Sequence, residues 1–189
     1  LQIVLCIWPL FYLSTDLLES NFSSEVAQLA SLGYIIANCL ASLAGCFIVE
    51  RFGRRPQMLL LGAIHTAGLC AFIAAELLIP LWPVARYGQI ASLLVMGVAY
   101  GVGLGPVSLF ITSELVPQHA RALVQSMVLA LNTAMAAALS FVTLPLYRWA
   151  GVLVFVPLFV LPSVVALLFL FRSLPESAGR EIHEVVEEI

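Results

Sequence analysis

The stretch Val26–Val49, "VAQLASLGYIIANCLASLAGCFIV", contains no charged side chain. A helix rises about 1.5 Å per residue, so roughly 20 apolar residues cross the hydrocarbon core of a bilayer. In lipid, a single segment must be helical, because only a helix satisfies its own backbone hydrogen bonds there. The stretch therefore predicts a membrane-spanning helix.

Five further apolar runs of similar length surround it, at about Leu1–Leu18, Gln57–Ile79, Tyr87–Ile111, Ala122–Leu146 and Val152–Phe171. The chain is 62% hydrophobic and only 10% charged, with a mean hydropathy of +1.06. A soluble domain has about 25% charged residues, and 189 residues cannot bury this much apolar surface. We predict an all-α integral membrane protein: a six-transmembrane-helix bundle over residues 1–172, with the lipid bilayer as its surroundings.

Residues 173–189 are polar and read as a tail. Four apolar residues fall on one helical face with acids opposite, which predicts a short amphipathic helix: Ile182, Val185, Val186 and Ile189. Alternate gaps between the apolar runs hold six arginines against two, Arg86 and Arg148, on the other side. Because cytoplasmic loops are enriched in arginine, both ends of this multi-pass chain are predicted to be cytoplasmic.

Several functional classes are excluded by composition and spacing. The chain has no lysine and no long basic patch, so nucleic acid is not expected as a partner. No nucleophile–base pair, metal-ligand cluster or phosphate-binding loop is recognisable in the sequence. We expect no enzyme activity, no metal and no cofactor.

The gap "VERFGRRP" at Val49–Pro56 follows the first quoted run and is unusually rich in charge. Glu50 adjoins Arg51, and the same pairing recurs where Glu114 precedes Arg121 and Glu176 follows Arg172. Arginine alone would orient the chain, and acids add little to orientation. The accompanying acids predict ion pairs that join one helix end to another, with plain orientation as the alternative.

Two runs carry polar stripes at helical spacing. One is Ser31, Asn38, Ser42 and Gly45, and the other is Gln125, Asn132, Ala136 and Thr143. Polar residues deep in a span usually face a cavity or another helix. Two carboxamides at matching depth could bind the hydroxyls of a sugar, since an amide both donates and accepts. An ordinary hydrogen bond between helices is the alternative.

The fourth run contains the segment "MGVAYGVGLGP", with Gly101, Gly103, Gly105 and Pro106. Glycine weakens a helix and proline removes a backbone hydrogen bond. This segment is therefore predicted to bend and to act as a gate, and close packing against another helix is an equally compatible interpretation. His65, in the third run, has no acidic neighbour on its turn, which predicts a packed or hydrogen-bonded histidine.

Four motifs occur in an order that resembles one known family. These are "FYLST" (Phe11–Thr15), "ERFGRR" (Glu50–Arg55), "GLGPVSLFITSELVPQHAR" (Gly103–Arg121) and "LPESAGR" (Leu174–Arg180). Together they resemble the sugar-porter family of the major facilitator superfamily, the facilitative hexose transporters. The resemblance covers nearly the whole chain, aligned with spans seven to twelve, and implies one half of a major facilitator superfamily fold.

The resemblance also implies roles for particular residues. It implies a cytoplasmic ion-pair network that stabilises an outward-facing state, formed by Glu50, Arg54, Arg55, Glu114 and Arg121; Arg51 and Glu176 join it by the pairing noted above. It implies sugar contacts by Gln2, Asn38 and Asn132. Departures from the family pattern leave the identity of the solute open, and they are Ile3, Trp8, Gly101, Leu109 and Thr133.

The resulting prediction is the C-terminal half of a plasma-membrane uniporter that moves a hexose or similar small solute by alternating access. Uniport is favoured over proton symport because the acid nearest a span interior, Glu76, lies close to a span end. A complete facilitator has two six-span halves, so an N-terminal six-helix half is the expected partner. The alternative is a non-transporting sugar receptor or a regulatory half-transporter.

Overall fold

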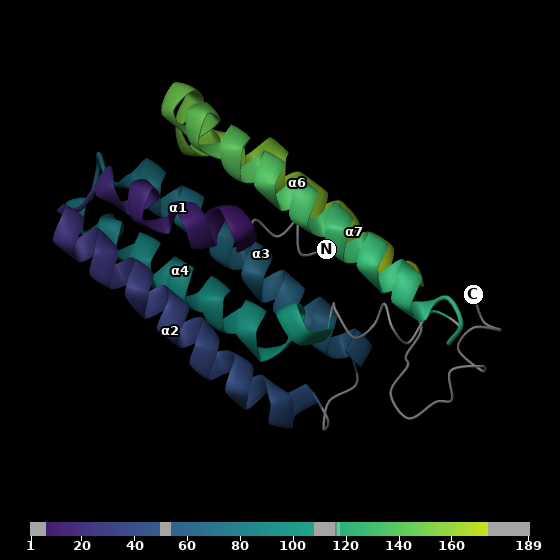
Figure 1. Cartoon of the computed structure of the whole chain (residues 1–189). Helices are drawn as coiled ribbons and strands as arrows, with labels where there is room; N and C mark the ends of the chain where they lie inside the picture. Colours follow the sequence, from purple (N-terminus) through teal and green to yellow (C-terminus); the bar gives the residue numbers. More distant parts are fainter. Residues whose placement is uncertain (1–6, 50–53, 108–115, 117, 174–189) are drawn as a thin grey trace.

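The computed structural model describes residues 7–49, 54–107, 116 and 118–173. Every regular element in this part of the chain is helical (Figure 1). The all-α membrane fold predicted from the apolar runs is confirmed, and four helices are long and apolar enough to cross a membrane: Ser24–Ile48, Arg55–Leu78, Pro83–Val107 and Arg121–Val154. The predicted helix in the tail lies outside the described residues.

Within the described residues, six helical segments follow one another. The first three are α1 (Ile7–Glu19), α2 (Ser24–Val49) and α3 (Arg54–Leu78). The fourth is continuous from η1 (Pro83–Ala85) through α4 (Arg86–Ala99) to the π-helical η2 (Tyr100–Leu104). The last two are α6 (Arg121–Ala150) and the run η3 (Gly151–Val154), η4 (Val156–Val160) and α7 (Leu161–Ser173). Each segment overlaps one predicted apolar run.

The fifth run ends later than its composition predicts. The expected gap after Leu146 is instead the last turn of α6, which continues to Ala150. Gly151 ends the helix with φ of +69°, a backbone conformation that glycine adopts at little cost. Pro145 lies inside α6 without ending it, as membrane helices tolerate.

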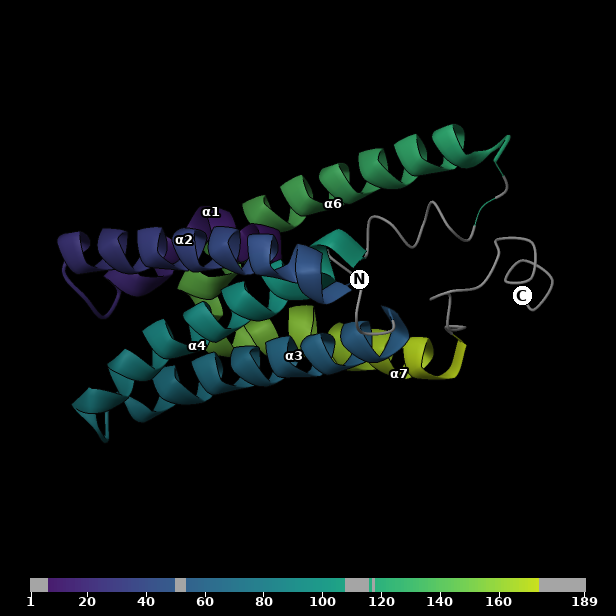
Figure 2. The same cartoon turned by 90° about the horizontal axis from the view of Figure 1, so that it is seen from below.

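The helices pair in a way that relates the two halves of the chain. α2, the second helix of the first three-helix unit, packs against α4 and η2, which belong to the first helix of the second unit. α1, the first helix of the first unit, packs against α6, the second helix of the second unit. α3 packs against both α4 and α7, and Figure 2 shows α3 and α7 side by side. This pairing is what the inverted repeats of transporter folds produce.

Successive helices alternate in direction, so their termini gather at two ends of the bundle. The turn end comprises the α1–α2 turn, the C-termini of α3 and α6 and the N-terminus of α4; Asn21 of the turn donates to Gln89 of α4 over 3.3 Å. The arginine end comprises the N-terminus of α3 and the C-terminus of α7. There the Arg55 guanidinium donates to the Phe171 carbonyl over 2.7 Å and lies 5.9 Å from the Phe171 ring centroid.

The hydrophobic core joins α1, α2, α3, α4 and the last segment. Phe155 is central to it, with ring centroids 6.3 Å from Phe72 of α3 and 5.9 Å from Tyr147 of α6. Tyr34 of α2 and Phe159 of η4 are fully buried in the same cluster. α6 contributes little to this core, and it stands beside α1 with space between them.

Candidate functional site

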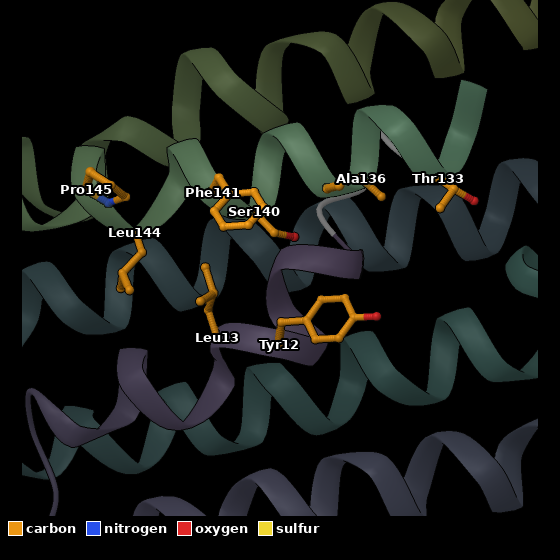
Figure 3. Close-up of a pocket in the computed structure, with 9 residues that line it drawn as sticks. Tyr12, Leu13, Thr133, Ala136, Ser140, Phe141, Leu144 and Pro145 are labelled. Carbon is orange, nitrogen blue, oxygen red and sulfur yellow. The ribbon is translucent and has the colours of Figure 1, made fainter. Parts of the chain in front are cut away.

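A cavity of about 730 Å³ lies between α1 and α6. Nine residues line it (Figure 3), and they are Tyr12, Leu13, Thr133, Ala136, Ala137, Ser140, Phe141, Leu144 and Pro145. Sites for small molecules typically measure 300–1,000 Å³ and are mostly apolar with a few polar groups. This cavity has that character, because three hydroxyl groups interrupt an otherwise apolar wall and none of its nine described lining residues is charged.

The register of α6 creates the space. Its lining residues recur every three or four positions, so they form one helical face. Ala136, Ala137 and Ser140 are small. Figure 3 shows Tyr12 and Leu13 of α1 on the other side of the cavity from Ala136 and Ser140. The space therefore lies between the small side chains on this face of α6 and the larger side chains of α1.

Two of the hydroxyls differ in how they are satisfied. The Thr133 hydroxyl donates back to the Leu129 carbonyl of its own helix over 2.9 Å. The Ser140 hydroxyl is buried and has no hydrogen-bond partner among the described residues. A buried polar group without a partner is uncommon and asks for a ligand or water. The Ser140 oxygen is covered by its neighbours in this structure, whereas Tyr12 is 67% exposed and Thr133 is exposed as well.

The polar stripe predicted on the fifth run is the buried face of α6. Asn132, Ala136 and Thr143 are buried, whereas Gln125, the first residue of the predicted stripe, is only half-buried, and Tyr147 continues the stripe by one further turn. Ala136 belongs both to this buried face and to the cavity wall. Asn132 lies one helical turn before Ala136 on the same face, so it borders the cavity without being part of its lining.

The stripe predicted on the second run packs against neighbouring helices. The Asn38 amide donates to the Gly97 carbonyl of α4 over 3.1 Å, and Ser31 accepts from Thr15 of α1 over 3.0 Å. Asn38 thus makes the interhelical hydrogen bond that its sequence position left open as the alternative. A contact between Asn38 and a solute stays a prediction.

The glycine-rich segment approaches two helices closely. A β-carbon at Gly101 would lie 2.5 Å from the Asn38 carbonyl oxygen, and one at Gly103 would lie 2.4 Å from the Gln57 amide nitrogen. The segment is π-helical at Tyr100–Leu104, and π-helical turns are frequent at functional sites. Close packing is thus a role these glycines fill, while gating by Gly101, Gly103, Gly105 and Pro106 stays a prediction.

Four polar residues that no sequence pattern connects meet at the turn end. The Glu76 carboxylate accepts from the Tyr147 hydroxyl over 2.6 Å and from the Gln89 amide over 3.3 Å, and Asn21 donates to Gln89. This turn-end network connects α3, α6, α4 and the α1–α2 turn. Its one sequence signal was Tyr147, which continues the spacing of the α6 stripe.

Most residues of the predicted ion-pair network, and the predicted sugar-contacting Gln2, lie outside the part of the chain that the structure describes. Gln2, Glu50, Arg51, Glu114 and Glu176 lie outside the described residues, and Arg54 begins α3 without a described side chain. Arg55 joins two helix ends as expected of the network, although its described partners are the carbonyl and ring of Phe171.

Two other predicted polar residues have buried nitrogen atoms, although Arg121 as a whole is only half-buried. Arg121 begins α6, and its Nε is buried without a hydrogen-bond partner among the described residues. His65 is fully buried in α3, and neither ring nitrogen has a partner in that part of the chain. The packed histidine that the sequence predicted is thus what the described residues show.

The known proteins that this chain is similar to agree with this geometry. The major myo-inositol transporter of Bacillus subtilis is 28% identical over 186 residues, which is 94% of this chain and 38% of the relative. Sugar transporter ERD6-like 16 of Arabidopsis thaliana is 26% identical over 93% of this chain and 36% of its own length. Solute carrier family 2 facilitated glucose transporter member 4 of Bos taurus is 33% identical over 115 residues, 59% of this chain and 22% of the relative.

The chain thus spans less than two fifths of the length of these curated relatives. The family model described as "Sugar (and other) transporter" matches residues 1–188, almost the whole sequence. With an all-helical membrane fold, paired three-helix units and an uncharged cavity already in place, this match is decisive: the chain belongs to the sugar (and other) transporter family, the sugar porters of the major facilitator superfamily.

Proposed function

We propose that this chain is the C-terminal half of a facilitative transporter for a hexose or a similar small neutral solute. The cavity between α1 and α6 is the observation that carries the proposal. Its wall has no charged residue, and Tyr12, Thr133 and Ser140 bring hydroxyl groups to it. Such a wall suits a polyhydroxylated neutral solute better than an ion.

The proposed solute site extends from this cavity toward residues that the sequence selected. Asn132 borders the cavity on the buried face of α6 and is 9% exposed. Gln2 precedes α1, and Asn38 lies on α2. We propose that these three carboxamides contact the solute, with the Asn38 amide also holding α4 through Gly97.

A second six-helix half is the proposed partner. α6 exposes large apolar side chains, with Phe141 82% and Trp149 85% exposed. In transporters with paired halves, the solute binds between them near the middle of the membrane. The open side of the α1–α6 cavity would face the other half, while the outer apolar surface would face lipid.

Transport by alternating access would require the two halves to rock. We propose that the arginine end is cytoplasmic, as arginine-rich loops usually are, and that residues 1–172 form the membrane domain with 173–189 as the tail. In this orientation Arg55, Arg121 and their neighbours would form the cytoplasmic network. Ion pairs at this end would favour one state of the cycle, and the transporter would act as a plasma-membrane uniporter.

Uptake of radiolabelled hexose into proteoliposomes tests the proposal. The chain reconstituted alone should give no uptake, whereas the chain joined to its six-span N-terminal half should give saturable uptake. Uptake by the chain alone would contradict the half-transporter assignment. Hexose binding without uptake in the joined protein would favour a sugar receptor or regulatory partner instead.

A pair of substitutions tests the cavity itself. Ala137→Leu fills part of the cavity and should raise the KM for hexose by about tenfold or more, since a few methylenes in a pocket discriminate that strongly. Ala138→Leu is the matched control, because Ala138 is exposed and is not part of the lining. Equal effects of the two substitutions would remove the cavity from the solute site.

A further inference from the structure

The carbonyl of Val102 lacks the donor that an ordinary helix would provide. In an α-helix this carbonyl accepts from the amide of residue 106, but Pro106 has no N–H. The backbone here is already displaced from α-helical pairing, because the Gly105 amide donates to the Tyr100 carbonyl, five residues back. Val102 lies in the middle of the π-helical segment, and proline at position 106 removes the α-helical donor of its carbonyl.

A side chain from another helix reaches this carbonyl. The Gln57 amide, in the first turns of α3, donates to the Val102 carbonyl over 3.2 Å. Gln57 is only 5% exposed, and its Oε1 is buried without a partner among the described residues. Burying a carboxamide whose oxygen has no hydrogen-bond partner is unfavourable. The hydrogen bond that the Gln57 amide donates to Val102 offsets part of this cost and explains why a polar residue is tolerated here.

The surroundings leave room for this contact. Gly103 has no side chain where a β-carbon would lie 2.4 Å from the Gln57 amide nitrogen, so any larger residue would displace the amide. On the opposite side, a β-carbon at Gly45 of α2 would lie 2.3 Å from the Val102 carbonyl oxygen. Two glycines thus admit the peptide of Val102 between α2 and α3.

We propose that Gln57 is a positioning residue that replaces the hydrogen bond withheld by Pro106 and so holds the glycine-rich segment in its π-helical form. Gln57 lies two residues after Arg55, which binds the end of α7, so one turn of α3 fastens both α7 and the glycine-rich segment. If this segment gates the solute path, release of the Gln57 contact is a step of the cycle. That last link rests on the proposed function, whereas the contact itself does not.

A four-variant thermal-unfolding cycle on this chain in detergent tests the contact without any transport measurement. Gln57→Met keeps the length and removes the donor, and it should lower Tm by about 2–4 °C. Pro106→Ala restores an N–H for the Val102 carbonyl, so in that background Gln57→Met should lower Tm by less than half as much. Equal shifts in both backgrounds would show that Gln57 only fills space, and would overturn the proposal.

Gly103→Ala provides a second measurement should Pro106→Ala fail to fold. Its β-carbon should displace the Gln57 amide and also press on Leu61 Cδ1, so Tm should fall; combined with Gln57→Ala, the total shift should be clearly smaller than the sum of the two single shifts, with Leu61 accounting for the remainder. Fully additive shifts would contradict the proposal.

In the joined transporter, Gln57→Met should change the turnover number by about fivefold with KM unchanged. An altered KM with constant turnover would contradict the positioning role. An inactive wild-type transporter would instead count against the proposed function, and the unfolding cycle would still decide the contact.

Discussion

The two polar stripes, one on α2 and one on α6, have similar sequence spacing and different surroundings. The α2 stripe is closed: Asn38 bonds to α4, Ser31 bonds to α1, and Gly45 admits the backbone of η2. The α6 stripe is partly open, since Ala136 is shared between the buried face and the cavity with α1. Spacing therefore identifies a buried face but does not say whether that face meets a helix or a cavity.

The partner helix decides the outcome. α2 faces the glycines of η2, where Gly101 lets two backbones approach, while α6 faces the large Tyr12 and Leu13 of α1. Small residues on facing positions let two membrane helices approach closely. In the most apolar stretch of α3, 50% of the residues are buried, compared with 11% in that of α6. α3 packs between α4 and α7, whereas α6 has much of its surface free for lipid or for another half.

We expect the greatest loss of stability from a substitution that disrupts the packing of the α2 stripe. Gly45→Ala places a β-carbon against the Val102 backbone, which cannot move aside as a side-chain tip can, and should cost about 1–3 kcal/mol of unfolding free energy. Gly33→Ala on the same helix is the matched control. A β-carbon there meets nothing within 4 Å, so its higher helix propensity should leave stability unchanged or raise it by up to about 1 kcal/mol.

Denaturation in mixed detergent micelles would measure both glycine variants. The interpretation of α2 as a tightly closed seam requires the two substitutions to differ in sign or clearly in size. A Gly45→Ala protein as stable as Gly33→Ala would mean that α2 and η2 have room to separate.

The next effect concerns the end of the α6 stripe. Tyr147→Phe removes the hydroxyl that donates to Glu76 over 2.6 Å and should cost about 1–2 kcal/mol, because the half-buried carboxylate loses its shortest described hydrogen bond. Tyr87→Phe is the control, since that ring is 55% exposed and its hydroxyl accepts from Arg86 only at 3.5 Å. Hydrogen exchange at the turn end should rise in the first variant alone; unchanged exchange would show that the Glu76 contacts do not hold α6.

Local sequence features predicted much of this architecture. Uncharged runs gave the helices, and helical spacing correctly placed Asn132, Ala136 and Thr143 on one buried face. The fourth run, whose glycines and proline the sequence singled out, contains the π-helical η2. These features depend on neighbours within a few turns, so periodicity and backbone chemistry are sufficient to find them.

Contacts between distant residues were beyond the sequence. Glu76 was interpreted as a span-end acid, yet it binds Tyr147, which is 71 positions away along the chain. The Gln57–Val102 contact depends on a donor from a different helix, and the cavity depends on how two helices 120 residues apart face each other. Such partners follow from packing, which a single sequence does not reveal.

The smallest expected loss of stability comes from removing a carboxamide, and the same substitution at Asn38 and at Asn132 compares the two stripes directly. Asn38→Ala removes one interhelical hydrogen bond and should lower stability by about 0.6 kcal/mol, the average for such bonds in membrane proteins. Asn132→Ala, beside the open cavity, should instead raise the KM for hexose in the joined transporter by more than Asn38→Ala does. Both variants are compared by thermal unfolding and by uptake. If Asn38→Ala weakens uptake as strongly as Asn132→Ala, the α2 stripe contacts solute as well as α4, and the distinction between a closed and an open stripe would have to be abandoned.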